Sequence, residues 1–509
     1  MMNYAANWVD CIAERAKADP EAIALVKGDD QLSYQDLWRR SGQFAAFLIQ
    51  SGFTKNARVA FYLPKSIEAV VALVGVARAG GTVVPINPAL KVDQFSHIIN
   101  DAGTDILVTA QARLRSLQTQ HEICKQVICV DDMKLDEALS LDMPVDVSTK
   151  DLCILFYTSG STGRPKGVMV THDNMKAGAE IVASYLGLRQ EDRILSLLPW
   201  SFDYGFNQLA GGFQAGATVV LMDFLLPQDV PRQIERHRIT VLGCVPPLWH
   251  QLMDVDWSDQ ARKGLRIATN TGGRVSRILS ARLKDCFPNA KLFLMYGLTE
   301  AFRSTYLDPA QVERRPDSIG KAVPGEEVLI VNDQGEICRP GEIGELVHTG
   351  RLVAAGYWQD ELRTARRFKA PPKASRYFGT SQLSVFSGDK ARYDEDGFIY
   401  FIGRDDEMIK TSGYRVSPTE IEELAMSCHG VGQAFACGVD DERLGQSIAL
   451  VLESEKGLSE AQSGFLSEFK GKAPNFMVPG TVIWMENLPI GPHGKLDRTA
   501  LAAIVMRGE

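Results

Sequence analysis

The chain lacks the features that mark membrane, secreted and zinc-binding proteins. No uninterrupted apolar run reaches the roughly 18 residues of a membrane-spanning helix, and no basic segment followed by an apolar one opens the chain. Its nine cysteines form no Cys-x-x-Cys pair, and nothing near the closest two, Cys124 and Cys129, completes a zinc set. Scattered thiols are typical of a reducing compartment. We therefore expect a soluble cytoplasmic protein with no membrane span.

An excess of basic charge is also missing. The formal net charge is −8, which offers no positive field to nucleic acid. Hydrophobic residues make up 45% and charged residues 23%, values that suit an ordinary globular enzyme. The 509 residues are enough for two or more domains with a large buried core.

Helix-like and strand-like segments alternate over the first 300 residues. Repeated strand-then-helix units predict largely parallel sheets covered by helices, and hence an α/β fold. Helices are expected at 8–18, 34–51 and 66–79, and strands at 22–26, 31–34, 58–62, 82–85, 194–198, 218–222, 240–245 and 291–296.

The pattern changes twice after residue 320. Short strands at 328–331, 344–348 and 398–402, separated by Gly, Pro and Asp turns, predict a small antiparallel subdomain. Beyond Arg404, helices at 419–428 and 459–471 and strands at 431–439 and 447–452 predict a separate α+β unit. We expect a large domain over 1–404 and a small one over 405–509.

Residues 157–167 have the sequence Tyr-Thr-Ser-Gly-Ser-Thr-Gly-Arg-Pro-Lys-Gly and follow a strand-like run. Such residues leave backbone N–H groups and hydroxyls open to an anion, as phosphate-binding turns do. The Walker A spacing is absent. The segment predicts a phosphate-binding loop, with a flexible linker as the alternative.

Four later segments carry further candidate chemistry. In 294–300 an apolar strand ends in an exposed Tyr296 that could stack on a purine, with Thr299 for phosphate and Glu300 for Mg²⁺. The alternative is an ordinary turn with a surface glutamate. In 387–397 a turn presents Asp389, whose carboxylate could accept bonds from ribose hydroxyls, and the acidic residues 394–396 suit a solvated hairpin turn.

The remaining two segments are 403–415 and 489–498. The second places Lys495 in a glycine-rich loop. A lone lysine in such a loop is usually only a solvated charge.

In this order along the chain, the five segments resemble the motifs of the adenylate-forming superfamily, which includes acyl-CoA synthetases, peptide-synthetase adenylation domains and luciferases. The resemblance covers nearly the whole chain. The stretch 296–306 also resembles a subgroup of stand-alone ligases associated with exosortase gene clusters.

The resemblance implies a binding site for ATP and Mg²⁺. Tyr296 would stack on adenine, Asp389 and Arg404 would bind ribose, and Thr299 and Glu300 would bind phosphate and the metal. Lys495 would bridge the substrate carboxylate and the α-phosphate, acting in catalysis with Thr162 and Glu300. The other implied cofactor-binding residues are the phosphate loop Thr158, Ser159, Gly160, Ser161, Thr162, Gly163 and Lys166, and Gly272, Gly273 and Gly297.

The same resemblance implies two half-reactions. The carboxylate first attacks the α-phosphate of ATP, and a thiol then attacks the acyl-adenylate. Because Lys495 would obstruct the thiol, the small domain must rotate, with the hinge at Asp406 and with Gly413 in the loop that swings in.

The acid is indicated by the segment 199–207, which contains Phe202-Asp203. In amino-acid-activating relatives an aspartate here pairs with the substrate ammonium, so Asp203 predicts an amino acid. The alternative is a loop carboxylate facing water, in an acyl-CoA synthetase for a fatty or other acid. Further implied pocket residues are Asn207, Cys244, Thr269, Thr271, Met295, Arg303 and Ser304.

Arg303 does not suit a plain aliphatic tail, since an unpaired buried guanidinium is costly. Two roles stay open for it: binding a second anionic group on the substrate, or pairing with Asp203.

The acceptor implied is a phosphopantetheine thiol, on coenzyme A or on a carrier protein. No strongly basic patch suits the 3′-phosphate of coenzyme A, which favours a carrier protein. No carrier segment follows Lys495, so a stand-alone ligase is expected. A catalytically inactive nucleotide-binding protein and a luciferase-like oxygenase are the alternatives from other classes.

Overall fold

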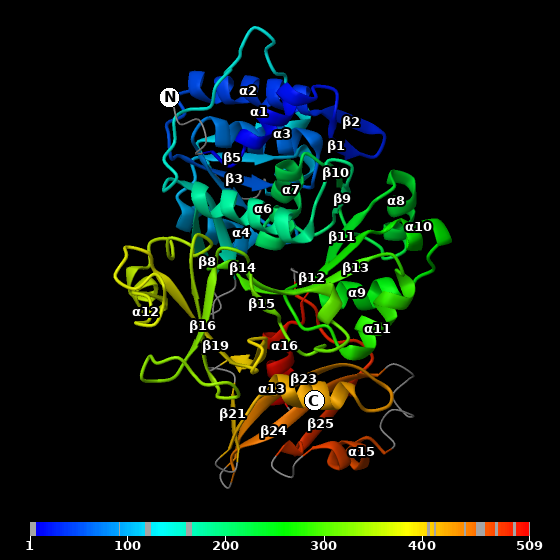
Figure 1. The fold of residues 1–509 in the computed structure, drawn as a ribbon. Helices are drawn as coiled ribbons and strands as arrows, with labels where there is room; N and C mark the ends of the chain where they lie inside the picture. The colour runs from blue at the N-terminus through cyan, green and yellow to red at the C-terminus, as the bar shows by residue number, and fades with distance from the viewer. Residues whose placement is uncertain are drawn as a thin grey trace.

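The computed structural model describes residues 7–90, 92–117, 124–158, 165–404, 408–411, 414–441, 444–454, 464–473, 477–491 and 495–507. Within these ranges it contains four sheets. The α/β class expected from the sequence is confirmed. Figure 1 shows the N-terminal helices at one end of the molecule and the sheet of residues 409–485 at the other.

The first sheet has six strands, which are parallel except for the last. Its order is β6 (Gln126–Cys129), β5 (Ile106–Thr109), β3 (Arg58–Tyr62), β4 (Thr82–Pro85), β7 (Leu152–Thr158) and β8 (Lys166–Thr171). Strand β8 returns antiparallel to β7, so Thr158 lies opposite Lys166. The predicted phosphate loop therefore connects two paired strands, although its residues 159–164 lie outside the described ranges.

The second sheet has nine strands. Its order is β15 (Lys321–Ala322), β14 (Phe302–Leu307), β13 (Lys291–Leu298), β12 (Ile267–Asn270), β11 (Val241–Cys244), β9 (Arg193–Ser196), β10 (Thr218–Leu221), β1 (Ile23–Lys27) and β2 (Asp30–Ser33). Strands β13, β12, β11, β9, β10 and β1 run parallel. The predicted strands at 22–26 and 31–34 are confirmed as an antiparallel pair.

Helices cover the two sheets because their apolar faces need burial. One apolar cluster joins helices of the N-terminal half to strands of both sheets, and α3 is buried along nearly its whole length. These helices are α1 (Asp10–Ala18), α2 (Tyr34–Gln50), α3 (Ile67–Arg78), α6 (His172–Leu186) and α7 (Asp203–Ala215). Ser33 and Ser66 begin α2 and α3 by accepting backbone N–H bonds, as N-caps do.

Other helices cover the outer faces. Helices α4 (Val92–Ala102) and α5 (Gln111–Leu117) contribute to a cluster with the six-stranded sheet. The far face of the nine-stranded sheet packs against α8 (Asp229–His237), α9 (Pro246–Met253), α10 (Asp259–Gly264) and α11 (Arg277–Cys286).

The third sheet is antiparallel, as the change of pattern after residue 320 predicts. Its strands are β16 (Glu327–Val331), β17 (Gly344–Thr349), β19 (Ser384–Tyr393) and β18 (Phe368–Lys369), with β20 (Ile399–Arg404) paired to β19 and α12 (Glu361–Arg367) beside it. The acidic residues 394–396 do form the β19–β20 turn. Glu395 and Asp396 are exposed, as expected of a solvated turn, and Asp394 and Asp396 also bind Arg315.

The last sheet has its own apolar clusters, built only from residues 409–505. Its strands are β22 (Tyr414–Val416), β21 (Ile409–Thr411), β24 (Gly445–Ser454), β23 (Val431–Asp441) and β25 (Thr481–Met485). Helices α13 (Pro418–Met426), α15 (Phe465–Lys472) and α16 (Arg498–Arg507) accompany them. The boundary at 404/405 stays a prediction.

Candidate active site

The candidate site lies at the carboxyl ends of β11, β12 and β13. These parallel strands are in register, with Cys244 beside Asn270 and Asn270 beside Leu294. Ligands commonly bind at this edge of a parallel sheet. The structure therefore brings together the predicted residues that end or follow these strands, namely Cys244, Thr269, Thr271, Gly272, Gly273, Met295, Tyr296, Gly297, Thr299 and Glu300.

A tight turn after β13 carries Thr299 and Glu300. Gly297, near the end of β13, must be glycine, because a Cβ on it would lie 1.9 Å from the backbone oxygen of Phe302 on the returning strand β14. The turn directs the chain back into the antiparallel β13–β14 pair. It places Thr299 and Glu300 next to each other at the sheet edge.

Glu300 is held by two partners from distant parts of the chain. The Lys166 ammonium lies 2.9 Å from Glu300 Oε1, and the Tyr357 hydroxyl donates to the same oxygen at 2.7 Å. The Glu300 side chain is 12% exposed, so it is not the surface glutamate of the alternative interpretation. Burial alone would raise the pKa of the Glu300 carboxyl, but Lys166 and Tyr357 hold it below its ordinary value. The carboxylate is therefore ionised.

Tyr357 is a site residue that the sequence did not reveal. Its hydroxyl also lies 2.9 Å from the Lys166 ammonium, 191 residues away along the chain. No local pattern marks Tyr357, because only the approach of β8 to the loop after β17 brings the two side chains together.

Tyr296, Asp389 and Arg404 form a second group. The Tyr296 hydroxyl donates to Asp389 Oδ2, and Arg404 Nε lies 3.3 Å from Asp389 Oδ1. Asp389 and Arg404 are directly opposite on β19 and β20. The pair implied for ribose is therefore adjacent.

Two expectations about this group are wrong. Asp389 lies within strand β19 rather than in a turn, since pairing with β20 continues through it. Tyr296 is partly buried rather than exposed, because β13 continues to Leu298 and the ring stacks on His348 with a centroid distance of 6.0 Å.

His348 provides a test of pH dependence. It is buried on β17, both ring nitrogens lack a hydrogen-bond partner among the described residues, and burial lowers its pKa to about 3. The unfolded chain protonates this imidazole first as the pH falls. The stability that depends on a neutral His348 is therefore fully present above about pH 6.5 and is lost as the pH drops towards 3. Each pH unit in that window is expected to lower the unfolding free energy by about 1.4 kcal/mol.

The measurement is the urea unfolding free energy at several pH values between 6.5 and 4. His348→Phe should reduce the slope of the unfolding free energy against pH by the equivalent of about one proton, or about 1.4 kcal/mol per pH unit. His429→Gln, at an exposed side chain, is the matched control and should leave the slope unchanged. An unchanged slope in His348→Phe would contradict a neutral buried imidazole.

Lys495 reaches the site from the C-terminal part of the chain. Its ammonium lies 5.0 Å from the Phe202 ring centroid. Gly272 has a φ of +78°, which favours glycine, and a Cβ there would lie 2.9 Å from Lys495 Cε. Burial lowers the pKa of Lys495, and Asp203 opposes that shift. The lysine is therefore not a solvated loop charge.

Asp203 and Arg303 pair with each other. Arg303 Nη1 lies 3.3 Å from Asp203 Oδ2, and the side chains of Arg303 and Asp203 are only 1% and 6% exposed. Of the two roles left open for Arg303, the structure shows the pairing with Asp203.

The other predicted acyl-side residues are also buried. Met295 Sδ accepts from the Tyr185 hydroxyl at 2.8 Å, and Ser304 Oγ donates to Ala301 O at 3.1 Å. Thr269 Oγ1 bonds the Tyr204 hydroxyl. Asn207, Cys244 and Thr271 are also buried.

Some predicted residues lie outside the described ranges: Ser159, Gly160, Ser161, Thr162, Gly163, Asp406 and Gly413. Of the phosphate loop, Thr158 and Lys166 are described. The Thr158 hydroxyl is buried and has no hydrogen-bond partner in the part of the chain that the structure describes.

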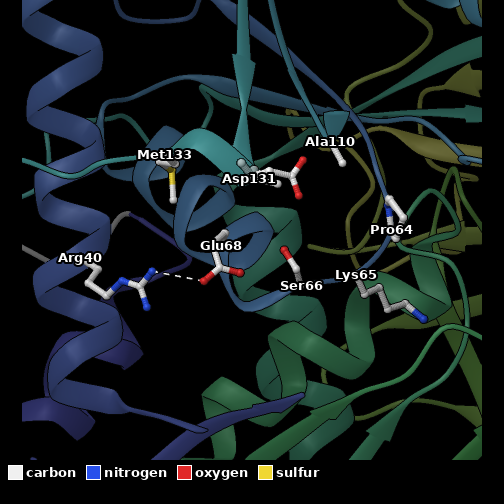
Figure 2. A pocket seen from close by; sticks show the side chains of 9 residues that line it. Arg40, Pro64, Lys65, Ser66, Glu68, Ala110, Asp131 and Met133 are labelled. Carbon is white, nitrogen blue, oxygen red and sulfur yellow. Dashed lines mark hydrogen bonds and ion pairs between the residues drawn. The ribbon is translucent and has the colours of Figure 1, made fainter. Parts of the chain in front are cut away.

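A separate pocket of about 390 Å³ lies where β3 meets the start of α3 (Figure 2). An ion pair between Arg40 and Glu68 borders it. Lys65 turns its ammonium away from that pair and donates to the backbone oxygens of Ser196, Leu197 and Met222. None of the sequence-predicted site residues lines this pocket, so it is separate from the candidate active site.

No helix in the described ranges combines the length and apolar character needed to cross a bilayer.

Comparison with known proteins gives a consistent result. A plipastatin synthase of Bacillus subtilis (strain 168) is 31% identical over 97% of this chain, and the dimodular nonribosomal peptide synthase of the same organism is 29% identical over 97%. The chain spans only 14% and 21% of the length of these two relatives.

Two solved structures share the fold over nearly the whole chain. ATP-bound MatB from Rhodopseudomonas palustris has a TM-score of 0.86 at 25% identity, covering 97% of this chain and 98% of MatB. o-Succinylbenzoate CoA synthetase (MenE) from Bacillus subtilis, with ATP and magnesium, has a TM-score of 0.83 at 26% identity and covers 97% of this chain and 99% of MenE.

The family model for AMP-binding enzymes matches residues 12–358. That segment includes β7 and β8 around the predicted phosphate loop, the β13–β14 turn with Glu300, and Tyr357. The resemblance noted in the sequence is thereby confirmed: the chain belongs to the AMP-binding enzymes of the adenylate-forming superfamily.

Proposed function

We propose that this protein activates a carboxylic acid with ATP and then transfers the acyl group to a phosphopantetheine thiol. In the first step a carboxylate oxygen bonds to the α-phosphorus and the bond to pyrophosphate breaks. In the second step the thiol sulfur bonds to the acyl carbon, AMP leaves, and the thiol proton is released.

One observation carries this proposal. The Lys495 ammonium lies against Gly272 and Phe202, at the sheet edge that also presents Tyr296 and Glu300. A cation there opposes the negative charge that develops when a carboxylate attacks a phosphate.

The residues present fit ATP and Mg²⁺. The orphaned Thr158 hydroxyl and the Lys166 ammonium suit phosphate oxygens, and Asp389 suits ribose hydroxyls. The ionised Glu300 carboxylate is the oxygen ligand that Mg²⁺ prefers. A bound Mg²⁺ would neutralise charge on the phosphates and on the departing pyrophosphate. The complexes of MatB with ATP, and of MenE with ATP and magnesium, support this assignment.

Two acceptors are compatible with this chemistry. One relative in Bacillus subtilis is a nonribosomal peptide synthase, which supports a carrier protein and amino-acid activation. The solved structures include a CoA synthetase, which supports free coenzyme A as the second candidate. Comparison of kcat/KM for coenzyme A and for a phosphopantetheinylated carrier protein distinguishes them.

The test of the proposed function is pyrophosphate exchange with a panel of amino, dicarboxylic, aryl and fatty acids. Acid-dependent exchange that requires Mg²⁺ is the expected result. If no acid supports exchange and no acyl-adenylate forms, the proposal fails.

An ion-pair cluster joins the two parts of the chain and bears on the proposed domain rotation. Arg274, just after β12, binds both Asp317 and Glu423, the latter on α13. Arg277 also binds Asp317, in an ion pair that does not involve α13. Arg274 therefore links the sheet edge to the C-terminal part in the orientation that brings Lys495 to Gly272.

We expect Glu423→Gln to weaken this orientation. A partly exposed ion pair is worth up to about 1 kcal/mol, so adenylation should slow by up to about fivefold relative to thioester formation. The measurement is the ratio of pyrophosphate exchange to thioester formation from a supplied acyl-adenylate. Arg277→Gln is the matched control and should leave that ratio unchanged. If the ratio fell in Arg277→Gln but not in Glu423→Gln, the role of Glu423 would be contradicted.

A further inference from the structure

The ion pair between Asp203 and Arg303 bears on the class of acid. Asp203 is the first residue of α7, and Arg303 lies on β14. Besides the 3.3 Å contact to Oδ2, Arg303 Nη2 donates to the backbone oxygen of Asp203 at 3.3 Å. The guanidinium lies 5.0 Å from the Tyr204 ring centroid and 4.8 Å from that of Phe302. The carboxylate thus already has a cationic partner inside the protein.

Asp203 already has a cationic partner at 3.3 Å and lies among charges of both signs. Burial raises the pKa of the Asp203 carboxyl, Arg303 and Lys495 oppose that shift, and Glu300 adds to it. A substrate ammonium would have to compete with Arg303 for the Asp203 carboxylate. Burying an unpaired charge is costly, so this arrangement disfavours an acid that brings an ammonium.

Two buried donors beside the pair have no acceptor among the described residues. They are Arg303 Nε and Asn207 Nδ2. Asn207 lies four residues after Asp203 on α7, so both side chains project from the same face of that helix. Leaving a buried donor unpaired weakens the site, and an oxygen atom of a ligand would satisfy it.

We propose that the acid activated by this protein lacks an ammonium group beside its carboxylate and carries an oxygen acceptor in its acyl portion, bound by Arg303 and Asn207. The substrate class is a hydroxy, oxo or dicarboxylic acid. This assignment rests on the proposed adenylation function and narrows it. It disfavours amino acids, because their ammonium would be buried where Arg303 already pairs with Asp203. It also disfavours plain fatty acids, because they leave Arg303 Nε and Asn207 Nδ2 unpaired.

The first experiment uses the wild-type protein and sets of acids with equal carbon number. Each set contains the unsubstituted, amino, hydroxy, oxo and terminal-carboxylate forms, and pyrophosphate exchange gives kcat/KM for each. The expected result is a preference of at least about tenfold for an oxygen-bearing acid over its amino and unsubstituted counterparts. Sites built to hydrogen-bond a substrate reject analogues that lack the group more strongly than pockets reject a missing methylene.

Two variants test the residues. Arg303→Leu frees Asp203, so the kcat/KM ratio of amino to oxygen-bearing acid should rise at least about tenfold. Asn207→Leu should lower the kcat/KM ratio of the oxygen-bearing to the unsubstituted acid at least about tenfold, and it carries the test if Arg303→Leu does not fold. Arg78→Leu removes another buried arginine, which binds Trp38 O and Ser41 Oγ, and should not alter either ratio.

The outcomes separate this inference from the proposed function. If the wild-type protein prefers an amino acid or an unsubstituted fatty acid, the inference is wrong and adenylation stands. If no acid in any set supports exchange, the proposed function fails and the inference fails with it.

Discussion

Replacement of Lys495 by alanine is expected to slow adenylate formation by about 10²–10³-fold while thioester formation from a supplied acyl-adenylate stays near the wild-type rate. In the structure Lys495 lies against Gly272 and Phe202, and burial lowers its pKa. A cation held in a partly buried site opposes developing phosphate charge without reorganising first. Charge on the attacked α-phosphate and the departing pyrophosphate develops in the first half-reaction. In the domain rotation that we propose, Lys495 leaves the site before the thiol attacks, so the first step should suffer.

Pyrophosphate exchange measures the first step, and consumption of a synthetic acyl-adenylate with thiol measures the second. Lys472→Ala is the matched control, since Lys472 is also in the C-terminal part but binds Glu468 and Ser427 at the surface. It should leave both rates unchanged. An equal loss in both steps for Lys495→Ala would contradict a role confined to adenylation.

The second large effect is on stability. Arg303→Ala is expected to lower the unfolding free energy by about 3–5 kcal/mol, because it leaves the Asp203 carboxylate buried without its partner. Burial already raises the pKa of Asp203, and loss of Arg303 raises it further. The folded variant then binds a proton more readily than the unfolded chain, so the loss should shrink as the pH falls and grow as it rises.

Urea unfolding followed by tryptophan fluorescence measures this effect. The double variant Asp203→Leu with Arg303→Met should recover much of the loss, since it removes both buried charges. Arg351→Ala, which breaks a surface pair with Asp173, is the control and should cost at most about 1 kcal/mol. If Arg303→Ala costs no more than this control, the pair is not the buried interaction described above.

Local patterns were enough for most of the secondary structure. The strands at 58–62 and 82–85 have the predicted bounds, and α3 ends just before Gly80, whose φ of +74° stops the helix. Apolar periodicity, serine caps and glycine ends are properties of neighbouring residues, which a sequence displays directly. The family was recognisable for the same reason, because its motifs are short contiguous segments.

The strand assignment of Asp389 could not be read in this way. Gly388 and Asp389 are ordinary turn residues, and only pairing with neighbouring strands such as β20 places Asp389 inside β19. Tertiary context overrode local preference there.

The sequence alone determined the α/β class, the superfamily, the candidate nucleotide-binding residues and the polar residues of the acyl side. The roles of those residues and the division at 404/405 are predictions that await the experiments above. The tertiary structure alone decided which side chains meet. Tyr357 joins Lys166 and Glu300, and Arg303 takes Asp203 as its partner across 100 residues. Burial and ion pairing depend on distances between elements that folding brings together, and no spacing along the chain encodes those distances.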